Sequence, residues 1–247
     1  MSLFKYIHPD RTDFLKNGSI RFSTPKSLND PFELKPQVSA SKISEIISKS
    51  IPAALHHKIN LEKINEDLTL RIYKGMEELG ILCLTESDEN LLMWAHYANS
   101  HQGFVVEFDE KNDFFKCRYN NDNPVGRLTR VKYTDTRPVI DLTNIEVVKS
   151  LPETIITKSK EWSYEQEWRF VLPIKNADKI IKNGSEIIYL FNYQKSSIKS
   201  ITFGCMTSKE KKSEIIEIIK SSHEYKNTII KEARIDKKSF KINIKEI

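Results

Sequence analysis

The spacing of apolar and polar positions predicts short strands interrupted by a few helices. Strand-like runs occupy residues 3–6, 19–23, 81–85, 103–109, 128–133, 162–172, 187–191, 198–203, 228–235 and 240–244. Helices are expected at residues 9–18, 90–98, 143–160 and 208–221. This order predicts an α+β fold with a mixed, largely antiparallel sheet, in one domain over residues 1–247 whose last part, 198–247, runs strand, helix, strand, strand.

Residues 41–79 differ from the rest because their apolar positions follow the helical period. Six apolar side chains recur at three- and four-residue steps, the spacing of an amphipathic helix: Leu61, Ile64, Leu68, Ile72, Met76 and Leu79. We therefore expect a helical insert at 41–79, whose apolar stripe covers the sheet.

The alternating run at 162–172 carries the most informative polar side chains. A period of two places Glu165, Glu167 and Arg169 on one face of the expected strand, opposite Trp162, Tyr164, Trp168 and Phe170. Burying two carboxylates and a guanidinium is costly unless they pair or face a polar cleft. Two interpretations stay open here, a catalytic acid pair in a cleft and a solvent-facing strand surface with a Glu–Arg pair.

A second group of polar residues lies near the N-terminus. The loop Asn29-Asp30-Pro31-Phe32-Glu33 follows an expected strand, and we expect it to reach a cleft; the alternative is a structural Asx turn capped by Pro31. Together with side chains of the two preceding strands, it supplies the candidate substrate- or cofactor-binding residues Lys5, Tyr6, Arg21, Ser23, Asn29, Asp30 and Glu33.

The third group is the segment from Trp94 to Gly103. Trp94 and Tyr97 share a helix face, while His96 points elsewhere and His101 lies in the following loop. Histidine is a common acid–base group, so His101 joins Glu165 and Glu167 as a catalytic candidate, and Trp94, His96, Tyr97 and Arg169 join the binding candidates. The alternative is an aromatic core cluster with hydrogen-bonded histidines.

Charge is unevenly distributed along the chain. The net charge is +5, but residues 195–247 alone hold thirteen Lys or Arg against seven Asp or Glu. A basic C-terminal third suits nucleic acid or another anionic partner. A lysine-rich solvated surface is the simpler alternative.

The spacing of the cysteines and the length of the apolar runs limit the classes of protein to which the chain can belong. Three widely spaced cysteines predict neither a disulfide framework nor a zinc site, and we expect no metal. No apolar run approaches the roughly 20 residues that span a bilayer, and the N-terminus lacks the features of a signal peptide. We therefore expect a cytoplasmic protein without membrane contact.

Taken together, the polar segments resemble a bacterial family catalogued as domain of unknown function 2971. The resemblance covers the chain up to about residue 172 and rests on Phe4-Lys5-Tyr6, Asn17-Gly18, Arg21-Phe22-Ser23-Thr24-Pro25, Leu28-Asn29-Asp30-Pro31-Phe32-Glu33, Met93-Trp94-Ala95-His96-Tyr97, His101-Gln102-Gly103, Phe108-Asp109 and Trp162-Ser163-Tyr164-Glu165-Gln166-Glu167-Trp168-Arg169. It implies a bacterial or phage-linked protein of the kind met near defence genes.

The order of elements also resembles the ADP-ribosyltransferase layout, including the DarT-like nucleic-acid modifiers. In that layout NAD is held by an early-strand His or Arg and a second-strand Ser or Tyr, and a late-strand Glu stabilises the ribose cation. Ser23 matches the second position and Glu167 the third, with Glu165 as the first acid of Glu-x-Glu. The early position, where the layout has His or Arg, is Lys5 in this chain. His8, Arg21 or His101 would then take the role of that His or Arg.

Three functions follow as alternatives. The first is an NAD-consuming transferase or glycohydrolase acting as a phage-defence (abortive-infection) or toxin effector, with an antitoxin or neighbouring defence protein as partner. The second is a nuclease that uses His96 or His101 as acid–base groups and Glu165 and Glu167 for a divalent ion. The third is a binding or sensor module without catalysis.

Overall fold

The computed structural model describes residues 2–39, 43–116, 126–141 and 152–247. Its centre is an eight-stranded sheet in the order β15-β14-β13-β5-β1-β4-β10-β6, in which only β13 and β14 pair in parallel. The strands are β1 (Ser2–Ile7), β4 (Leu79–Thr85), β5 (Phe104–Asp109), β6 (Leu128–Arg130), β10 (Glu167–Pro173), β13 (Ile198–Phe203), β14 (Ile229–Ile235) and β15 (Ile242–Glu246). The predicted α+β fold with a mixed, largely antiparallel sheet is confirmed.

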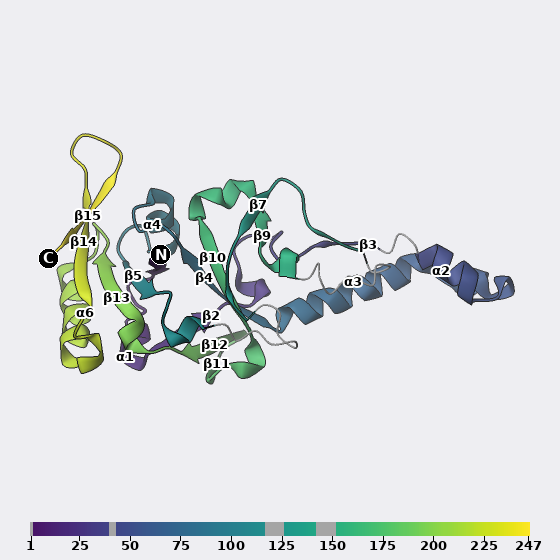
Figure 1. Ribbon diagram of the computed structural model, residues 1–247, viewed down its shortest axis with the longest axis horizontal. Coiled ribbons are helices and arrows are strands. Elements are labelled where there is room, and N and C mark those ends of the chain that lie inside the picture. The colour runs from purple at the N-terminus through teal and green to yellow at the C-terminus, as the bar shows by residue number, and fades with distance from the viewer. Residues whose placement is uncertain (1, 40–42, 117–125, 142–151) are drawn as a thin grey trace.

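The C-terminal segment closes one end of this sheet (Figure 1). Helix α6 (Lys209–Ser221) connects the parallel strands β13 and β14, begins at the capping side chain of Ser208 and buries Ile215 and Ile219. The hairpin β14–β15 follows it. The predicted order of strand, helix, strand and strand is confirmed.

A smaller sheet packs across the main one and encloses the aromatic core. It consists of β11 (Lys179–Asn183), β12 (Glu186–Asn192) and β2 (Ser19–Phe22), and β2 is preceded by the short helix α1 (Asp13–Asn17). Helix α1 begins four residues later than the expected start at Pro9 and ends at Gly18 in the left-handed conformation, as the sequence predicts. Core rings from both sheets meet those of the 3-10 turn Asp113–Phe115: Phe22, Phe114 and Phe170 contact one another edge-to-face, and Phe191 packs on Phe22 at a tilt.

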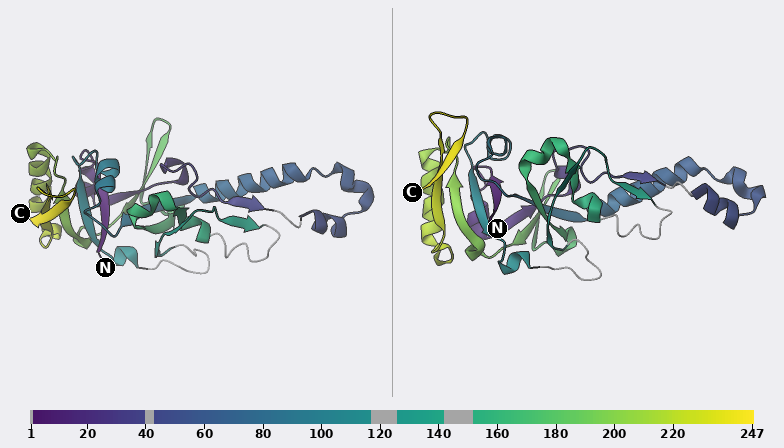
Figure 2. Two further views of the ribbon diagram at one scale, coloured as in Figure 1. Left: turned by 90° about the horizontal axis from the view of Figure 1, so that it is seen from above. Right: turned by 45° about the horizontal axis from the view of Figure 1, so that its top comes forward.

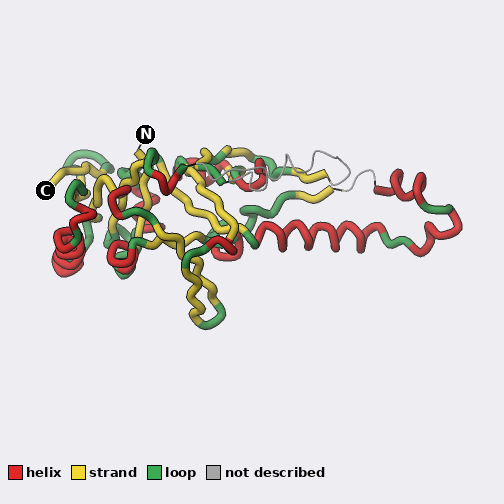
Figure 3. The backbone as a smooth tube through the Cα atoms, turned by 60° about the horizontal axis from the view of Figure 1, so that its bottom comes forward, coloured by secondary structure: helices red, strands yellow, loops and turns green. Residues whose placement is uncertain are grey.

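The predicted helical insert is present, but only its base packs against the sheet: Ile72 and Met76 join Ile81 and Val171 in one apolar cluster. Helices α2 (Ile43–Ser50) and α3 (Leu61–Glu77), joined by a 3-10 segment at Ala53–Lys58, form an arm that extends away from the body in every view (Figures 1, 2 and 3). Met76, at the base, is the buried side chain of α3. A short parallel pair, β3 (Gln37–Ser39) and β8 (Val139–Asp141), lies beside the arm.

Several other elements depart from the expected pattern. The predicted strand 162–172 begins only at Glu167, because Lys160–Glu165 form a 3-10 turn that ends at a left-handed Gln166. The predicted strand 128–133 breaks at Val131 into β6 and β7 (Lys132–Thr134). The predicted helix 143–160 contains strand β9 (Thr157–Ser159), paired with β7, after a helical turn at 152–155; its first part lies outside the described residues.

Candidate functional site

The predicted polar residues gather around a cavity of about 330 Å³ beside β1, β4 and helix α4 (Leu91–Tyr97). Asn90 caps α4 by accepting hydrogen bonds from the backbone N–H groups of Leu92 and Met93. Nine of the predicted site residues line the cavity: Lys5, Tyr6, Arg21, Ser23, Asn29, Glu33, Tyr97, Glu165 and Glu167. The early loop and the acid pair therefore share one hollow.

The acid pair reaches this cavity from two different elements. Glu167 is the first residue of β10, whereas Glu165 ends the preceding 3-10 turn. The left-handed Gln166 (φ 45°) lies between them, and both carboxylates are buried along the cavity wall. Their convergence therefore comes from a chain reversal and not from strand alternation.

Arg169 lies behind Glu167 and is not among the residues that line the cavity. Its guanidinium is fully buried and forms a fork with the carboxylate of Glu167, at 2.8 Å from Nε and 3.2 Å from a terminal nitrogen. It also pairs with Glu33 and donates to the carbonyl oxygen of Ile155. Burial lowers the pKa of Arg169 to about 9, while nearby Asp30 acts in the opposite direction. The guanidinium therefore remains charged at neutral pH.

Lys158, on β9, inserts a second cation between the carboxylates. Its ammonium lies 2.6 Å from Glu165, 3.0 Å from Glu167 and 3.7 Å from Glu33. The pKa of Lys158 is raised by Glu167 and Glu165, which outweigh the opposing effect of burial. The pKa of Glu167 is raised by burial, and Lys158 works against that rise. Charge pairing thus stabilises groups that would be costly to bury alone.

The early loop holds Glu33 in place through an Asx turn. The carboxylate of Asp30 accepts a hydrogen bond from the backbone N–H of Phe32 at 2.9 Å, and the N–H of Glu33 reaches the Asp30 carbonyl at 3.2 Å. Asp30 is buried behind the cavity wall and does not line it. Both interpretations of this loop therefore hold, since a structural turn delivers Glu33 to the charged cluster.

A hydrogen-bonded chain connects the loop to α4 and to the acid pair. Asn29 donates its amide to the Tyr97 hydroxyl at 2.9 Å, and that hydroxyl donates to Glu165 at 2.5 Å. Burial and the charge of Glu165 raise the pKa of Tyr97, so the hydroxyl keeps its proton. Every polar partner of Glu165 is thus a donor.

The charge of the buried cluster behind and along the cavity wall can be counted directly. Glu33, Glu165 and Glu167 face Lys158 and Arg169, which leaves one net negative charge on this cluster of five. Elsewhere in the lining Lys5 donates to the carbonyl oxygen of Cys83 at 2.9 Å, and Arg21 pairs with Glu186 at 2.7 Å. The cavity lining therefore combines the three carboxylates gathered around Lys158 with two separate cationic side chains.

Three predicted residues lie elsewhere. His101 lines a second pocket, where its ring stacks on Trp94 with centroids 6.2 Å apart, so the expectation that it shares the acid-pair hollow is wrong. Trp94 is buried in the core, packs against Tyr6 and donates to the carbonyl oxygen of Asp88. His96 is exposed on the outer side of α4.

The turn before β5 explains the position of His101. Asn99, Ser100 and His101 all have positive φ, which reverses the chain directly after α4. A Cβ on Gly204 would lie 2.0 Å from the carbonyl oxygen of His101, so this loop packs tightly against the turn after β13.

Two of the lining residues that sequence reasoning missed, Lys158 and Cys83, carry titratable groups. Lys158 lay within a segment expected to be helical, and Thr157-Lys158-Ser159, three consecutive polar residues, gives no strand-like alternation that could have indicated it. Cys83, on β4, pairs in register with Arg169 of β10, and burial and Glu167 raise the pKa of its thiol. An apolar strand gives no indication of such a neighbour.

Neither a metal-binding cluster nor a membrane-spanning helix occurs in the part of the chain that the structure describes. Within the described ranges, no group of three or more His, Cys, Asp or Glu side chains is arranged to hold a metal ion. Lys158 occupies the space between the carboxylates. Among the same residues, no helix combines the length and apolar character needed to cross a membrane.

Comparison with known proteins gives one match. No curated protein and no solved structure shows significant similarity to the chain. Residues 93–170, which run from α4 through most of β10, match a family model. The matched segment includes Tyr97 and, apart from Glu33, the whole charged cluster: Lys158, Glu165, Glu167 and Arg169. This part of the chain is similar to the family described as "Protein of unknown function (DUF2971)".

Proposed function

We propose that the cavity is the site of an NAD-consuming reaction, ADP-ribosyl transfer or NAD hydrolysis, in a bacterial defence or toxin effector. The observation that supports this proposal is the shared lining: the acid pair Glu165 and Glu167 meets Lys5, Arg21 and Ser23 in one hollow. The volume of about 330 Å³ falls at the lower end of small-ligand sites, enough for part of a dinucleotide.

The reaction needs negatively charged side chains next to the ribose. When the bond between nicotinamide and ribose breaks, the electron pair leaves with nicotinamide, and positive charge develops on the ribose. The single net negative charge of the cluster stabilises that ribose cation more than it stabilises the bound substrate, whose positive charge still lies on the nicotinamide ring, and such differential stabilisation raises the rate. Water or an acceptor nucleophile then forms the new bond at this carbon and releases a proton.

The remaining lining suits the rest of the dinucleotide. Lys5 and Arg21 supply cationic groups for a pyrophosphate, and a guanidinium matches phosphate oxygens in fork geometry. Ser23 lies next to β4 through a backbone bridge with Ile81 and adds a hydroxyl donor. Lys158 holds the two acids apart and keeps them oriented.

The arrangement favours this reaction over metal-dependent nucleic-acid cleavage. A two-metal site needs open carboxylate oxygens, whereas Lys158 lies within 3.0 Å of both acids. The two histidines considered for acid–base work are not in the cavity lining.

Release of nicotinamide from NAD tests the proposal. The wild-type chain is expected to release nicotinamide, and Glu165→Gln is expected to slow the release on the order of 100-fold, because the neutral amide no longer stabilises the ribose cation. Glu165 is preferred over Glu167 for this test because Glu167 also holds Arg169.

Glu107→Gln is the matched control. Glu107 lies on β5 outside the cavity and, like Glu165, is bonded to a lysine and to hydroxyl donors. It should leave nicotinamide release unchanged, with circular dichroism confirming that both variants are folded. No release by the wild-type chain, or equal rates for the two variants, would refute the proposed function.

A further inference from the structure

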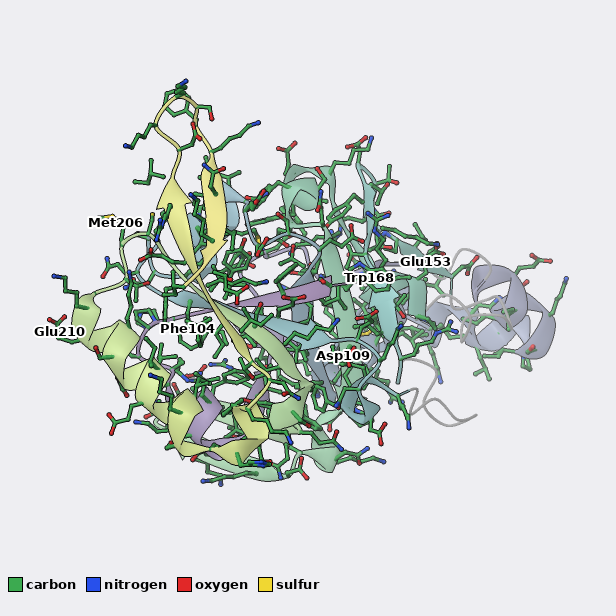
Figure 4. All side chains as sticks on the ribbon, turned by 60° about the vertical axis from the view of Figure 1, so that its left-hand side comes forward. Phe104, Asp109, Glu153, Trp168, Met206 and Glu210 are labelled. Carbon is green, nitrogen blue, oxygen red and sulfur yellow. The ribbon has the colours of Figure 1, made fainter. Side chains whose placement is uncertain are left out.

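The hairpin β14–β15 presents an ordered loop clear of the body (Figures 1 and 4). Asp236 organises this loop: its carboxylate accepts hydrogen bonds from the backbone N–H groups of Lys238 and Ser239, both at 2.8 Å, and from the side chains of Ser239 and Asn243. These donors lower the pKa of Asp236. Asp236, the only acidic residue of the loop, therefore stabilises the conformation of the loop.

The loop carries cations and an aromatic ring with no intramolecular use. Phe240 is 99% exposed, although a ring of this size is usually buried. Lys237, Lys238 and Lys241 surround it, and within the described ranges none of the three has an acidic partner within 4.0 Å. Elsewhere on this end of the sheet, lysines such as Lys212 and Lys231 are paired with Glu232 and Glu107.

A groove of about 560 Å³ runs beside this loop. Met206, 61% exposed and labelled in Figure 4 next to the hairpin, lies along it together with Leu91 and the ring of His101. Burial lowers the pKa of His101, so this ring is neutral at pH 7 and adds a flat face and no charge. The groove is therefore apolar inside and cationic at its rim.

We propose that the hairpin loop and its groove bind single-stranded nucleic acid. A ring without partners provides a stacking platform for a base, and every base offers a π-face. The three lysines pair with backbone phosphates, whose charge repeats along the strand. An unpaired strand is favoured over a duplex because the ring can reach only bases that are splayed out.

The proposed occupant fits better than the other anionic partners. An anionic membrane surface would place the aromatic and apolar groups in one plane, whereas here the apolar side chains line a recessed groove below the loop. An acidic peptide would satisfy the lysines but would leave Phe240 without a ring to stack on. Both partners are distinguished by the test.

Fluorescence anisotropy with a labelled 12-mer of deoxythymidine tests the proposal. The triple variant Lys237→Glu, Lys238→Glu, Lys241→Glu is expected to weaken binding at least 10-fold and to reduce the salt slope by about 2, since each lost phosphate contact contributes about 0.7. Phe240→Ala is expected to weaken binding on the order of 10-fold without changing the salt slope.

The second hairpin of the protein supplies the matched control. Lys175, Lys179 and Lys182 are exposed on or next to β11, beside exposed isoleucines and without an aromatic ring at the tip. Their triple replacement by Glu makes the same charge change and should leave affinity within about two-fold, apart from the general charge effect.

Equal losses in the two triple variants, or full affinity of Phe240→Ala, would overturn the proposal. So would tighter binding of a labelled poly-glutamate peptide, or of vesicles containing anionic lipid, than of the oligonucleotide. The assay measures binding at the hairpin and not nicotinamide release, so its outcome is separate from that of the proposed function.

Discussion

Replacement of Lys158 by methionine is expected to lower the free energy of unfolding by about 3–5 kcal/mol at pH 7, because it leaves buried carboxylates without their shared cation. The ammonium lies within 4 Å of Glu33, Glu165 and Glu167, all of which are buried. Methionine keeps the length of the side chain, so the loss measures charge and not volume. Urea denaturation followed by circular dichroism measures it.

The pH dependence of this variant follows from the same contacts. A carboxyl whose folded pKa lies above its unfolded value contributes stability that is present at low pH and is lost as pH rises through the folded pKa. The pKa of Glu167 is already raised by burial, and loss of Lys158 raises it further. The deficit of Lys158→Met should therefore be smaller at pH 5 than at pH 8.

Lys160→Met is the control for this prediction. Lys160 is two residues away, 58% exposed and paired with the exposed Asp135, so its replacement should cost less than about 0.5 kcal/mol. Equal stability of the two variants at pH 7 would show that the three carboxylates do not depend on Lys158.

Replacement of Arg169 by methionine is expected to cost a similar amount, about 3–5 kcal/mol, because it removes the fork that holds Glu167 and the pair with Glu33. Arg169→Lys keeps the charge but cannot reproduce the fork, so we expect an intermediate loss of about 2 kcal/mol. Chemical denaturation at pH 7 ranks the two variants.

Arg130 provides the comparison for Arg169. It lies on the neighbouring strand β6, directly opposite Trp168, with its side chain 61% exposed and paired with Glu86. Arg130→Met should be nearly neutral. If Arg169→Met were equally mild, or milder than Arg169→Lys, the buried cluster would not be held together by charge.

Much of the fold could be predicted from local patterns. The alternation of 103–109, the capped helix after Asn90 and the order of elements after residue 198 each follow from side chains close in sequence. The error at 162–172 arose because Trp162, Tyr164 and Glu165 alternate by chance within a 3-10 turn. The positive φ of Gln166 has no sequence signal, since glycine is the usual residue there.

The projecting arm shows a limit of a different kind. The period of α3 correctly indicates a helix, but a helical period does not say which surface the stripe meets. Only the base of α3, through Ile72 and Met76, packs against the sheet, and the rest of the arm extends outward (Figure 2). Short pairs such as β3–β8 contain too few residues for a reliable period.

The charged site could be predicted only in part. Burying isolated charges is costly, so buried acids and arginines are expected to pair. The structure agrees and brings together Glu33, Glu165, Glu167 and Arg169. Lys158 could not be found in this way, because its contacts depend on the pairing of β7 with β9, which brings together residues 25 positions apart. His101 was misplaced because the left-handed turn at 99–101 is not encoded by glycine.

The most direct test of the proposed site is calorimetric titration with an NAD analogue whose bond between nicotinamide and ribose cannot be cleaved. Ser27 is exposed at the cavity lining, and Ser27→Trp should fill the cavity without disturbing the core. Ser221→Trp, at an exposed serine whose hydroxyl likewise bonds a carbonyl oxygen three residues back, is the control. We expect the analogue to bind the wild-type chain and Ser221→Trp equally, and not to bind Ser27→Trp. Undiminished binding to Ser27→Trp, or no binding to the wild-type chain, would contradict a dinucleotide site at the acid pair.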